Sequence, residues 1–219
     1  MIRALVFDFD GLILETETPA YESWAEIYRE HGHDIPLERW HGYIGSDSGF
    51  DPAGHLAALV GEGFDRAAAQ ARRDARKSDM VAALDVMVGV RGYIHDAARR
   101  GLRLAVASSS SRAWVLGHLE RLGIHDPWDA VLCREDVART KPAPDLYLAA
   151  VTTLGVAPRE ALAFEDSTNG IAAAKDAGLL CVAVPNALTA GMDLSRADMR
   201  LTSLADTPLA ELLARLSQG

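Results

Sequence analysis

The chain has 219 residues, of which 49% are hydrophobic and 24% are charged, and its formal net charge at pH 7 is −9. This apolar content predicts a folded globular protein, because disordered chains contain far fewer apolar residues. The acidic balance disfavours nucleic acid as a partner, since proteins that bind it concentrate basic side chains on one surface.

Membrane insertion and secretion are also disfavoured by the sequence. The first apolar run is interrupted by Asp8 and Asp10 before it reaches the length of a signal-peptide core, and no run approaches the roughly 18 residues of a spanning helix. Cys133 and Cys181 lie in apolar segments without a metal-binding spacing, which indicates reduced core residues. We therefore expect a cytoplasmic protein that has no membrane partner and is a monomer or a weak dimer.

Short apolar runs alternate with helical patterns along most of the chain. Each run is apolar at successive positions, which is the pattern of a parallel strand that helices cover on both faces. The runs predict strands at Ala4–Asp8, Leu102–Ser108, Ala130–Cys133, Ala161–Asp166 and Leu179–Pro185. The sequence therefore predicts an α/β fold, in which ligands bind at the carboxyl ends of the strands.

The region from residue 16 to residue 88 interrupts this alternation. It contains no convincing strand, and apolar residues between Tyr21 and Tyr28 recur at helical spacing, with Thr18 expected as the N-cap and Pro19 in the first turn. The chain returns to the alternating pattern at a glycine-rich segment, 89–92. We therefore expect a helical insertion directly after the first strand.

Two carboxylates end the first strand, in the stretch LVFDFDGLI. Asp8 and Asp10 are two residues apart, so both side chains leave an extended backbone on the same side. Such a pair can bind a hard cation such as Mg²⁺, or it can divide the work between a nucleophile and a general acid and base. A helix cap or a solvent-exposed pair at the strand end is the alternative.

Polar residues also follow the later strands. Ser108 offers a hydroxyl group beside the N–H groups of an expected helix start, an arrangement that binds anions. Lys141 can neutralise a phosphate or a carboxylate, and Glu165 and Asp166 can complete a metal site. Each residue alone could be a helix cap or face solvent, but together they predict one site at the strand ends.

The four segments that carry these residues resemble the motifs of the haloacid dehalogenase-like hydrolase superfamily. The resemblance is strongest to the branch with a helical cap after the first strand, in the phosphatase and β-phosphoglucomutase-like group. The segments, in the family order, are DFDGLILETE (Asp8–Glu17), VASSSS (Val106–Ser111), TKPAPDLY (Thr140–Tyr147) and FEDSTNGIAAAKDAG (Phe164–Gly178).

The resemblance implies a Rossmann-like three-layer core around a central parallel sheet, with a helical cap domain inserted after the first strand. The implied domains are a catalytic core of residues 1–15 and 89–219 and a cap of residues 16–88. The resemblance also implies Mg²⁺ as the cofactor and phosphoryl transfer through an aspartyl phosphate. The expected substrate is a small phosphorylated metabolite, such as a sugar phosphate or phosphoglycolate.

Individual roles follow from the same resemblance. Asp8 is implied as the nucleophile, and Asp10 as the group that protonates the leaving oxygen and then activates water. Ser108 and Lys141 are implied to hold the transferring phosphoryl group. The implied metal ligands are Asp8, Asp10 through its backbone carbonyl, Glu165 and Asp166, and the implied substrate contacts are Ser108, Ser109, Lys141, Gly45 and Ser46.

Two departures from the family pattern favour hydrolysis over relocation of the phosphoryl group. Mutases resemble GxSRxxS in the first cap loop, whereas this chain has IGSDSGFDPAG, with Asp47 in place of the arginine, and it has Ala20 where mutases place a histidine. A phosphomutase, a phosphonatase that uses Lys77 and a metal-independent dehalogenase remain the alternative enzymes. A receiver-like binding domain, phosphorylated stably without turnover, is the alternative that is not an enzyme.

A basic stretch, RRDARK (Arg72–Lys77), lies within the insertion. We expect it to form a solvated helix face, because consecutive charged residues usually do so. A contact between Arg73, Arg76 or Lys77 and a distal phosphate of the substrate is the alternative.

Overall fold

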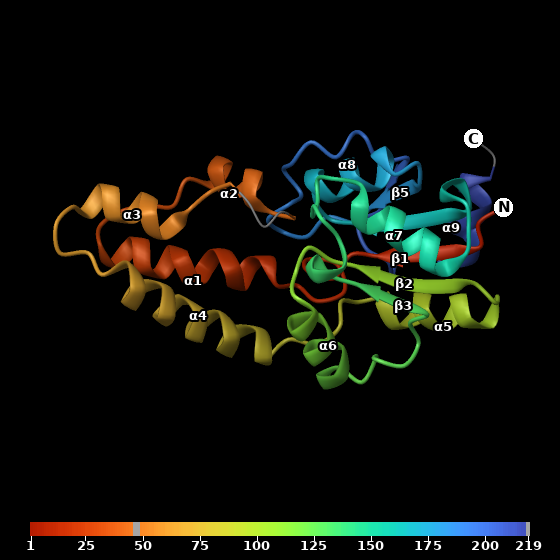
Figure 1. The fold of residues 1–219 in the computed structure, drawn as a ribbon, viewed down its shortest axis with the longest axis horizontal. Helices are drawn as coiled ribbons and strands as arrows, with labels where there is room; N and C mark the ends of the chain where they lie inside the picture. The colour runs from red at the N-terminus through yellow and green to blue at the C-terminus, as the bar shows by residue number, and fades with distance from the viewer. Residues whose placement is uncertain (46–48, 218–219) are drawn as a thin grey trace.

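A six-stranded parallel sheet lies at the centre of the computed structural model, which describes residues 1–45 and 49–217 (Figure 1). Within these residues the strand order is β3-β2-β1-β4-β5-β6, so β1 lies in the interior of the sheet. The strands are β1 (Ala4–Phe7), β2 (Arg103–Ala107), β3 (Ala130–Leu132), β4 (Ala161–Glu165), β5 (Leu180–Ala183) and β6 (Met199–Arg200). All neighbouring strands run parallel, which confirms the predicted α/β fold.

The five expected strands all form, and each is slightly shorter than its expected range. The sixth strand, β6, was not expected from the sequence. It has only two residues, and it forms because Met199 pairs with Val182 of β5 at the edge of the sheet. A segment this short carries no periodic pattern that could reveal it.

Helices cover both faces of the sheet and produce the predicted three layers. The covering helices are α5 (Val90–Arg99), α6 (Arg112–Arg121) and α9 (Leu209–Leu216) on one face, and α7 (Asp145–Leu154) and α8 (Thr168–Asp176) on the other. Successive strand residues point to opposite faces, so Leu5 and Phe7 join the first apolar cluster and Ala4 and Val6 the second. Two 3-10 helices, η1 (Arg134–Asp136) and η2 (Pro158–Glu160), precede α7 and β4.

The helical insertion lies between β1 and α5 and extends away from the sheet (Figure 1). It contains α1 (Glu17–Glu30), α2 (Leu37–Tyr43), α3 (Pro52–Val60) and α4 (Arg66–Ala82), which are called the cap below. The cap has an apolar cluster of its own, which includes Trp24, Tyr28 and Trp40, and α1 packs along α4. The predicted helical cap after the first strand is therefore confirmed, whereas its limits, residues 16–88, stay a prediction.

The start of α1 differs from the expectation. The helix begins at Glu17, and Thr18, the expected N-cap, already lies inside its first turn. The backbone N–H of Thr18 donates to Glu15 Oε1 at 3.0 Å, so the glutamate side chain satisfies a donor that a cap residue would otherwise satisfy. The hydroxyl group of Thr16, the residue before the helix, donates instead to Asp10 at 2.7 Å.

Two further observations concern the described part of the chain as a whole. None of its helices is long and apolar enough to cross a membrane. Cys133 and Cys181 are buried and free, which agrees with their expected place in the core.

Candidate active site

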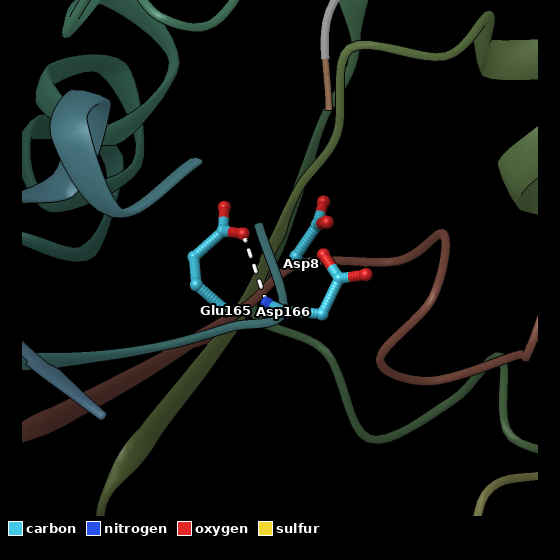
Figure 2. Close-up of side chains that lie close together, drawn as sticks. All are labelled: Asp8, Glu165 and Asp166. Carbon is cyan, nitrogen blue, oxygen red and sulfur yellow. Dashed lines mark hydrogen bonds between the residues drawn. The ribbon is translucent and has the colours of Figure 1, made fainter. Parts of the chain in front are cut away.

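Three buried carboxylates meet at the carboxyl edge of the sheet (Figure 2). Asp8 directly follows β1, Glu165 ends β4 and Asp166 is the next residue. One carboxylate oxygen from each of them lies within 4.8 Å of the other two. The neighbouring positions of β1 and β4 explain this meeting, because the N–H of Asp8 donates to the carbonyl group of Phe164 at 3.0 Å.

Lys141 supplies positive charge to this group. Its Nζ donates to Asp8 Oδ1 at 2.6 Å and to Glu165 Oε1 at 2.7 Å, and its side chain is only 1% exposed. Burial by itself would lower the pKa of Lys141, but the carboxylates of Asp8 and Glu165 outweigh that effect and raise it. Lys141 therefore stays protonated between the two strand ends.

One lysine does not compensate three buried carboxylates. Burial raises the pKa of Asp8, and the nearby charge of Glu165 raises it further, while Lys141 acts in the opposite direction. Burial and the charge of Asp8 likewise raise the pKa of Asp166. The three carboxylates and Lys141 together carry a net negative charge in a buried place, which is unfavourable. A bound cation would offset that charge.

A divalent cation such as Mg²⁺ fits this group for a second reason. Asp166 Oδ1 is buried and has no hydrogen-bond partner among the described residues, while Asp166 Oδ2 accepts a bond from Asn186 Nδ2 at 2.8 Å. A buried acceptor without a partner is costly. Carboxylate oxygens are the ligands that Mg²⁺ prefers, so Asp8, Asp166 and Glu165 form a suitable donor set.

Contacts around Glu165 hold its side chain in place. The hydroxyl group of Tyr147 donates to Glu165 Oε1 at 2.5 Å. On the other side, a Cβ atom at Gly170 would lie 1.9 Å from Glu165 Oε2, so that position on α8 accommodates no side chain. Sequence reasoning missed Tyr147, because it lies among the apolar residues of α7, and Asn186, although Asn186 follows the strand β5 just as the predicted residues follow theirs.

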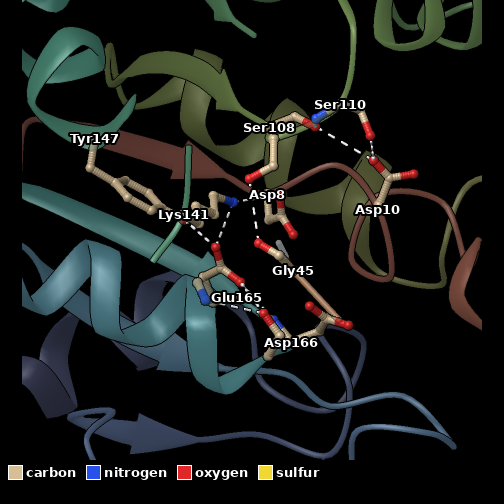
Figure 3. A network of polar contacts seen from close by, with 12 residues as sticks. Asp8, Asp10, Gly45, Ser108, Ser110, Lys141, Tyr147, Glu165 and Asp166 are labelled. Carbon is tan, nitrogen blue, oxygen red and sulfur yellow. Dashed lines mark hydrogen bonds and ion pairs between the residues drawn. The ribbon is translucent and has the colours of Figure 1, made fainter. Parts of the chain in front are cut away.

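Asp10 lies apart from the three carboxylates and faces the start of α6 (Figure 3). Its Oδ2 accepts a bond from Ser110 Oγ at 2.6 Å, and its Oδ1 accepts bonds from Thr16 Oγ1 at 2.7 Å and from Trp114 Nε1 at 2.9 Å. The side chain of Asp10 is thus surrounded by donors from both the core and the insertion point of the cap. Its predicted contact with a metal through the backbone carbonyl stays a prediction.

The serines after β2 lie between Asp10 and the cap. Ser108 is buried, its Oγ accepts a bond from the N–H of Ser110 at 3.0 Å, and it lies 3.5 Å from Asp10 Oδ2. Ser109 Oγ donates to the carbonyl oxygen of Gly45 at 3.4 Å. The structure therefore brings Ser108, Ser109 and Gly45 together, while their role as substrate contacts stays a prediction. Ser46 and Asp47 lie outside the described residues.

The cap also contacts the core at α8. Asn169 Nδ2 donates to the carbonyl oxygen of Ile44 at 2.8 Å, and a Cβ atom at Gly45 would lie 2.3 Å from Ser167 Oγ. Gly45 has a φ angle of 76°, which side chains rarely permit. A glycine at this position lets the cap loop approach the strand ends closely.

A cavity of 630 Å³ lies between the cap and the strand ends. Its core side includes Asp8, Asp10 and Ser108, and its cap side includes Arg73 and Lys77 of α4. The cavity is also lined by Glu17, Ala20, Asp74, Ser109, Ser110 and Trp114.

The expectation of a solvated face for the basic stretch was wrong for two of its residues. The Arg73 side chain is 12% exposed, and burial lowers the pKa of Lys77. Arg76 does lie on the outer face, where it pairs with Glu26 of α1 at 2.8 Å. The packing of α4 along α1 turns one side of the helix towards the cavity, which a run of consecutive charges could not reveal.

The fold and motifs agree with the comparisons to known proteins. A family model of haloacid dehalogenase-like hydrolases matches residues 5–184. YhcW of Bacillus subtilis (strain 168), named as a candidate phosphatase, is 43% identical over 217 residues, which cover 99% of this chain and 99% of YhcW. The validoxylamine A 7′-phosphate phosphatase of Streptomyces hygroscopicus subsp. limoneus is 32% identical over 206 residues, which cover 94% of this chain and 96% of that protein.

A solved structure agrees as well. CbbY from Rhodobacter sphaeroides, in complex with phosphate, matches with a TM-score of 0.76 and 30% sequence identity, over 97% of this chain and 99% of that chain. The family match covers most of the chain, and these relatives align over nearly all of it. The chain therefore belongs to the haloacid dehalogenase-like hydrolase family.

Proposed function

We propose that this protein is a Mg²⁺-dependent phosphatase that hydrolyses the phosphate monoester of a small metabolite. The observation that carries the proposal is the arrangement around Asp8, a buried carboxylate that Lys141 holds at the floor of a cavity, with Asp10 close by but separately bound. The phosphatase names of YhcW and the validoxylamine enzyme support the reaction class.

The reaction divides into two steps, and the first uses both aspartates. A carboxylate oxygen of Asp8 attacks phosphorus and forms an O–P bond, while the bond between phosphorus and the ester oxygen breaks and leaves its electron pair on that oxygen. Asp10 gives its proton to the leaving oxygen, which departs as an alcohol. The products of this step are an aspartyl phosphate at Asp8 and a deprotonated Asp10.

The second step releases phosphate. Asp10 takes a proton from a water molecule, whose oxygen forms a bond to phosphorus. The bond between phosphorus and Asp8 breaks, its electron pair returns to the Asp8 carboxylate, and inorganic phosphate leaves. Asp10 is then protonated again and ready for the next turnover.

The remaining residues bind and orient the reacting groups. Lys141 and Ser108 hold the transferring phosphoryl group, and Lys141 also fixes the direction of the Asp8 carboxylate. Mg²⁺, bound by Asp8 and Asp166 with Glu165 as a ligand or as support, supplies positive charge that offsets the repulsion between phosphate and carboxylate. The cap, residues 16–88 in the proposed division, excludes bulk water from the cavity.

The cap side of the cavity supports a substrate with a second negatively charged group, a phosphate or a carboxylate. Arg73 Nε is buried without a hydrogen-bond partner among the described residues, and Lys77 lies one helical turn further along α4. Asp74 neutralises part of this charge, since it accepts a bond from Arg73 Nη1 at 3.1 Å. Arg73 and Lys77 also keep a phosphomutase as the second candidate function, because a phosphomutase must bind a second phosphate group.

Release of inorganic phosphate from a panel of phosphorylated metabolites tests the proposal. With Mg²⁺ present, at least one monoester should be hydrolysed, and Asp8→Asn should reduce kcat/KM by about a thousandfold or more, because the nucleophile is lost. Removal of Mg²⁺ with a chelator should have a similar effect. A panel in which no substrate exceeds the Asp8→Asn background contradicts the proposal, and an isomerised phosphate ester without phosphate release identifies a mutase instead.

A further inference from the structure

Trp114 of α6 lines the cavity and donates its indole N–H to Asp10 Oδ1 at 2.9 Å. Thr16 Oγ1 donates to the same oxygen at 2.7 Å, whereas Ser110 Oγ contacts the other oxygen, Oδ2, at 2.6 Å. Asp10 Oδ1 thus has two donors, and the two oxygens of this carboxyl group have different surroundings. Ala20, which lines the same cavity from the cap, has no polar side-chain atom to add to this set.

The indole ring is held in place from several sides. One turn further along α6, the ring of His118 packs edge to face against it, with the ring centroids 4.3 Å apart. Lys77 of the cap lies over the ring, with Nζ 4.6 Å from its centroid. The backbone N–H of Trp114 donates to Ser111 Oγ at the start of the helix. These contacts fix the direction in which the indole N–H points.

Asp10 has four side-chain donors, which are the hydroxyl groups of Thr16, Ser108 and Ser110 and the indole N–H of Trp114, and they differ in what they permit. A hydroxyl group can rotate and can accept a bond as readily as it donates one, whereas an indole N–H can only donate. In a protonated carboxyl group the oxygen that carries the proton is a poorer acceptor than the other oxygen. Because the Trp114 N–H can only donate, its bond to Oδ1 favours the proton on Oδ2. The Ser110 hydroxyl can turn to allow this, and Oδ2 is also the oxygen that lies 3.5 Å from Ser108 beside Asp8.

We propose that Trp114 is a positioning residue for Asp10, because its N–H keeps Oδ1 as an acceptor and leaves Oδ2 to deliver the proton to the leaving oxygen. This inference rests on the proposed phosphatase function. The residue that orients Asp10 thus lies on α6 of the core. Ala20 of α1, which lines the same cavity, has no polar side-chain atom that could do so. The contact with Lys77 also means that the cap helps to hold the donor.

Comparison of two substrates tests this role. An alkyl monoester such as glycerol phosphate needs a proton on its leaving oxygen, whereas p-nitrophenyl phosphate releases a stable anion and needs little help. Trp114→Phe removes the N–H but keeps an aromatic ring under Lys77. We expect kcat/KM, which reports the first transfer, to fall by about 10-fold to 100-fold for the alkyl ester and by less than about 3-fold for p-nitrophenyl phosphate.

A matched control is Trp128→Phe, in which the same change removes an indole N–H that donates to the carbonyl oxygen of Ile124 at 2.7 Å, outside the cavity. It should leave the ratio of the two kcat/KM values unchanged. Because both substrates report the same folded molecules, partial unfolding of a variant does not alter that ratio. Trp114→His, which keeps a ring nitrogen as a donor, should restore part of the ratio and serves as the second variant.

The outcomes separate the two proposals. Wild-type protein that hydrolyses neither ester, nor any other monoester, overturns the proposed function. Wild-type activity with an equal loss on both esters in Trp114→Phe, or with no loss on either, overturns the role of Trp114 alone. A loss confined to the alkyl ester, with partial recovery in Trp114→His, supports it.

Discussion

Glu17 gives the cavity a charge that changes near neutral pH. Burial, and secondarily the charge of Asp10, raises the pKa of Glu17 from 4.5 to about 7, against the opposing effect of Lys77. An acid with a higher pKa in the folded state keeps its proton there at pH values where the unfolded chain has already lost it. The folded state therefore loses stability relative to the unfolded state as the pH rises from 4.5 to about 7.

Glu17→Gln should remove this pH dependence. Above pH 7 the variant should gain about 1–3 kcal/mol in free energy of unfolding relative to the wild type, and near pH 4.5 the gain should vanish. Urea denaturation at several pH values measures the difference, and Glu62→Gln, the same change at an exposed position of the cap, is the control. Parallel pH curves for Glu17→Gln and the wild type would contradict the prediction.

Residues at strand ends were the most predictable part of the site. Topology alone brings Asp8, Ser108, Glu165 and Asp166 to one edge, because parallel neighbouring strands end together. Trp114 could not be predicted in the same way. It lies on the same helix as the buried apolar residues Val115 and Leu119, and only the direction of its indole N–H distinguishes it from a core residue.

At the scale of single elements, α4 brings basic side chains of the cap to the cavity. One side of the helix faces the cavity with Arg73 and Lys77, and the other side pairs with acidic residues of α1, as in the contacts of Arg72 with Glu30 and Arg76 with Glu26. The outer pairs are exposed and contribute little to stability. The inner pair faces the space that the substrate occupies in the proposed reaction, so α4 is expected to affect specificity more than folding.

Arg73→Ala should weaken binding of substrates that carry a second negative charge. Loss of a charge-assisted hydrogen bond of about 1.5–3 kcal/mol corresponds to a rise in KM of roughly 10-fold to 100-fold. Substrates without the second charge should change by less than about 3-fold. Steady-state kinetics on matched pairs of substrates measures this, and Arg72→Ala, which removes an exposed pair of the same helix, is the control. An equal rise in KM for both kinds of substrate would rule out the assignment.

The long elements were predictable from the sequence and the short or terminal ones were not. Five strands follow from apolar runs that are buried on both faces, such as Ala4–Phe7. The edge strand β6 has two residues, and its pairing with β5 decides its conformation. The first turn of α1 depends on the reach of the Glu15 side chain to Thr18, which spacing alone does not specify.

For the whole molecule, we expect the buried carboxylates to make stability depend on the proposed cation. Asp8, Glu165 and Asp166 lie at the junction of β1 and β4, so their mutual repulsion acts on the centre of the sheet. Binding of a ligand to the folded state alone stabilises the protein in proportion to the logarithm of its concentration above Kd. The proposed Mg²⁺ site can therefore be examined without an enzymatic assay.

Mg²⁺ should raise the melting temperature of the wild type. At 100 times Kd the gain is about 2.7 kcal/mol, or about 5–10 °C for a domain of this size. The Asp166→Asn variant should lose most of this shift, because the substitution replaces a negatively charged carboxylate, whose Oδ1 has no partner among the described residues, with a neutral amide. Asp126→Asn, at an exposed acid remote from the cavity, should keep it. An unchanged shift in Asp166→Asn would place the ion elsewhere.

β1 is hydrogen-bonded to a neighbour on each side, whereas, among the described residues, the cap is joined to the core by separate bonds such as that from Asn169 to Ile44. Proteins open first where the fewest contacts must break. We therefore expect the cap to separate from the core more readily than β1 separates from its neighbouring strands. In the proposed reaction, substrate would therefore enter where the molecule opens most readily and meet Asp8 at the end of a strand that stays paired on both sides.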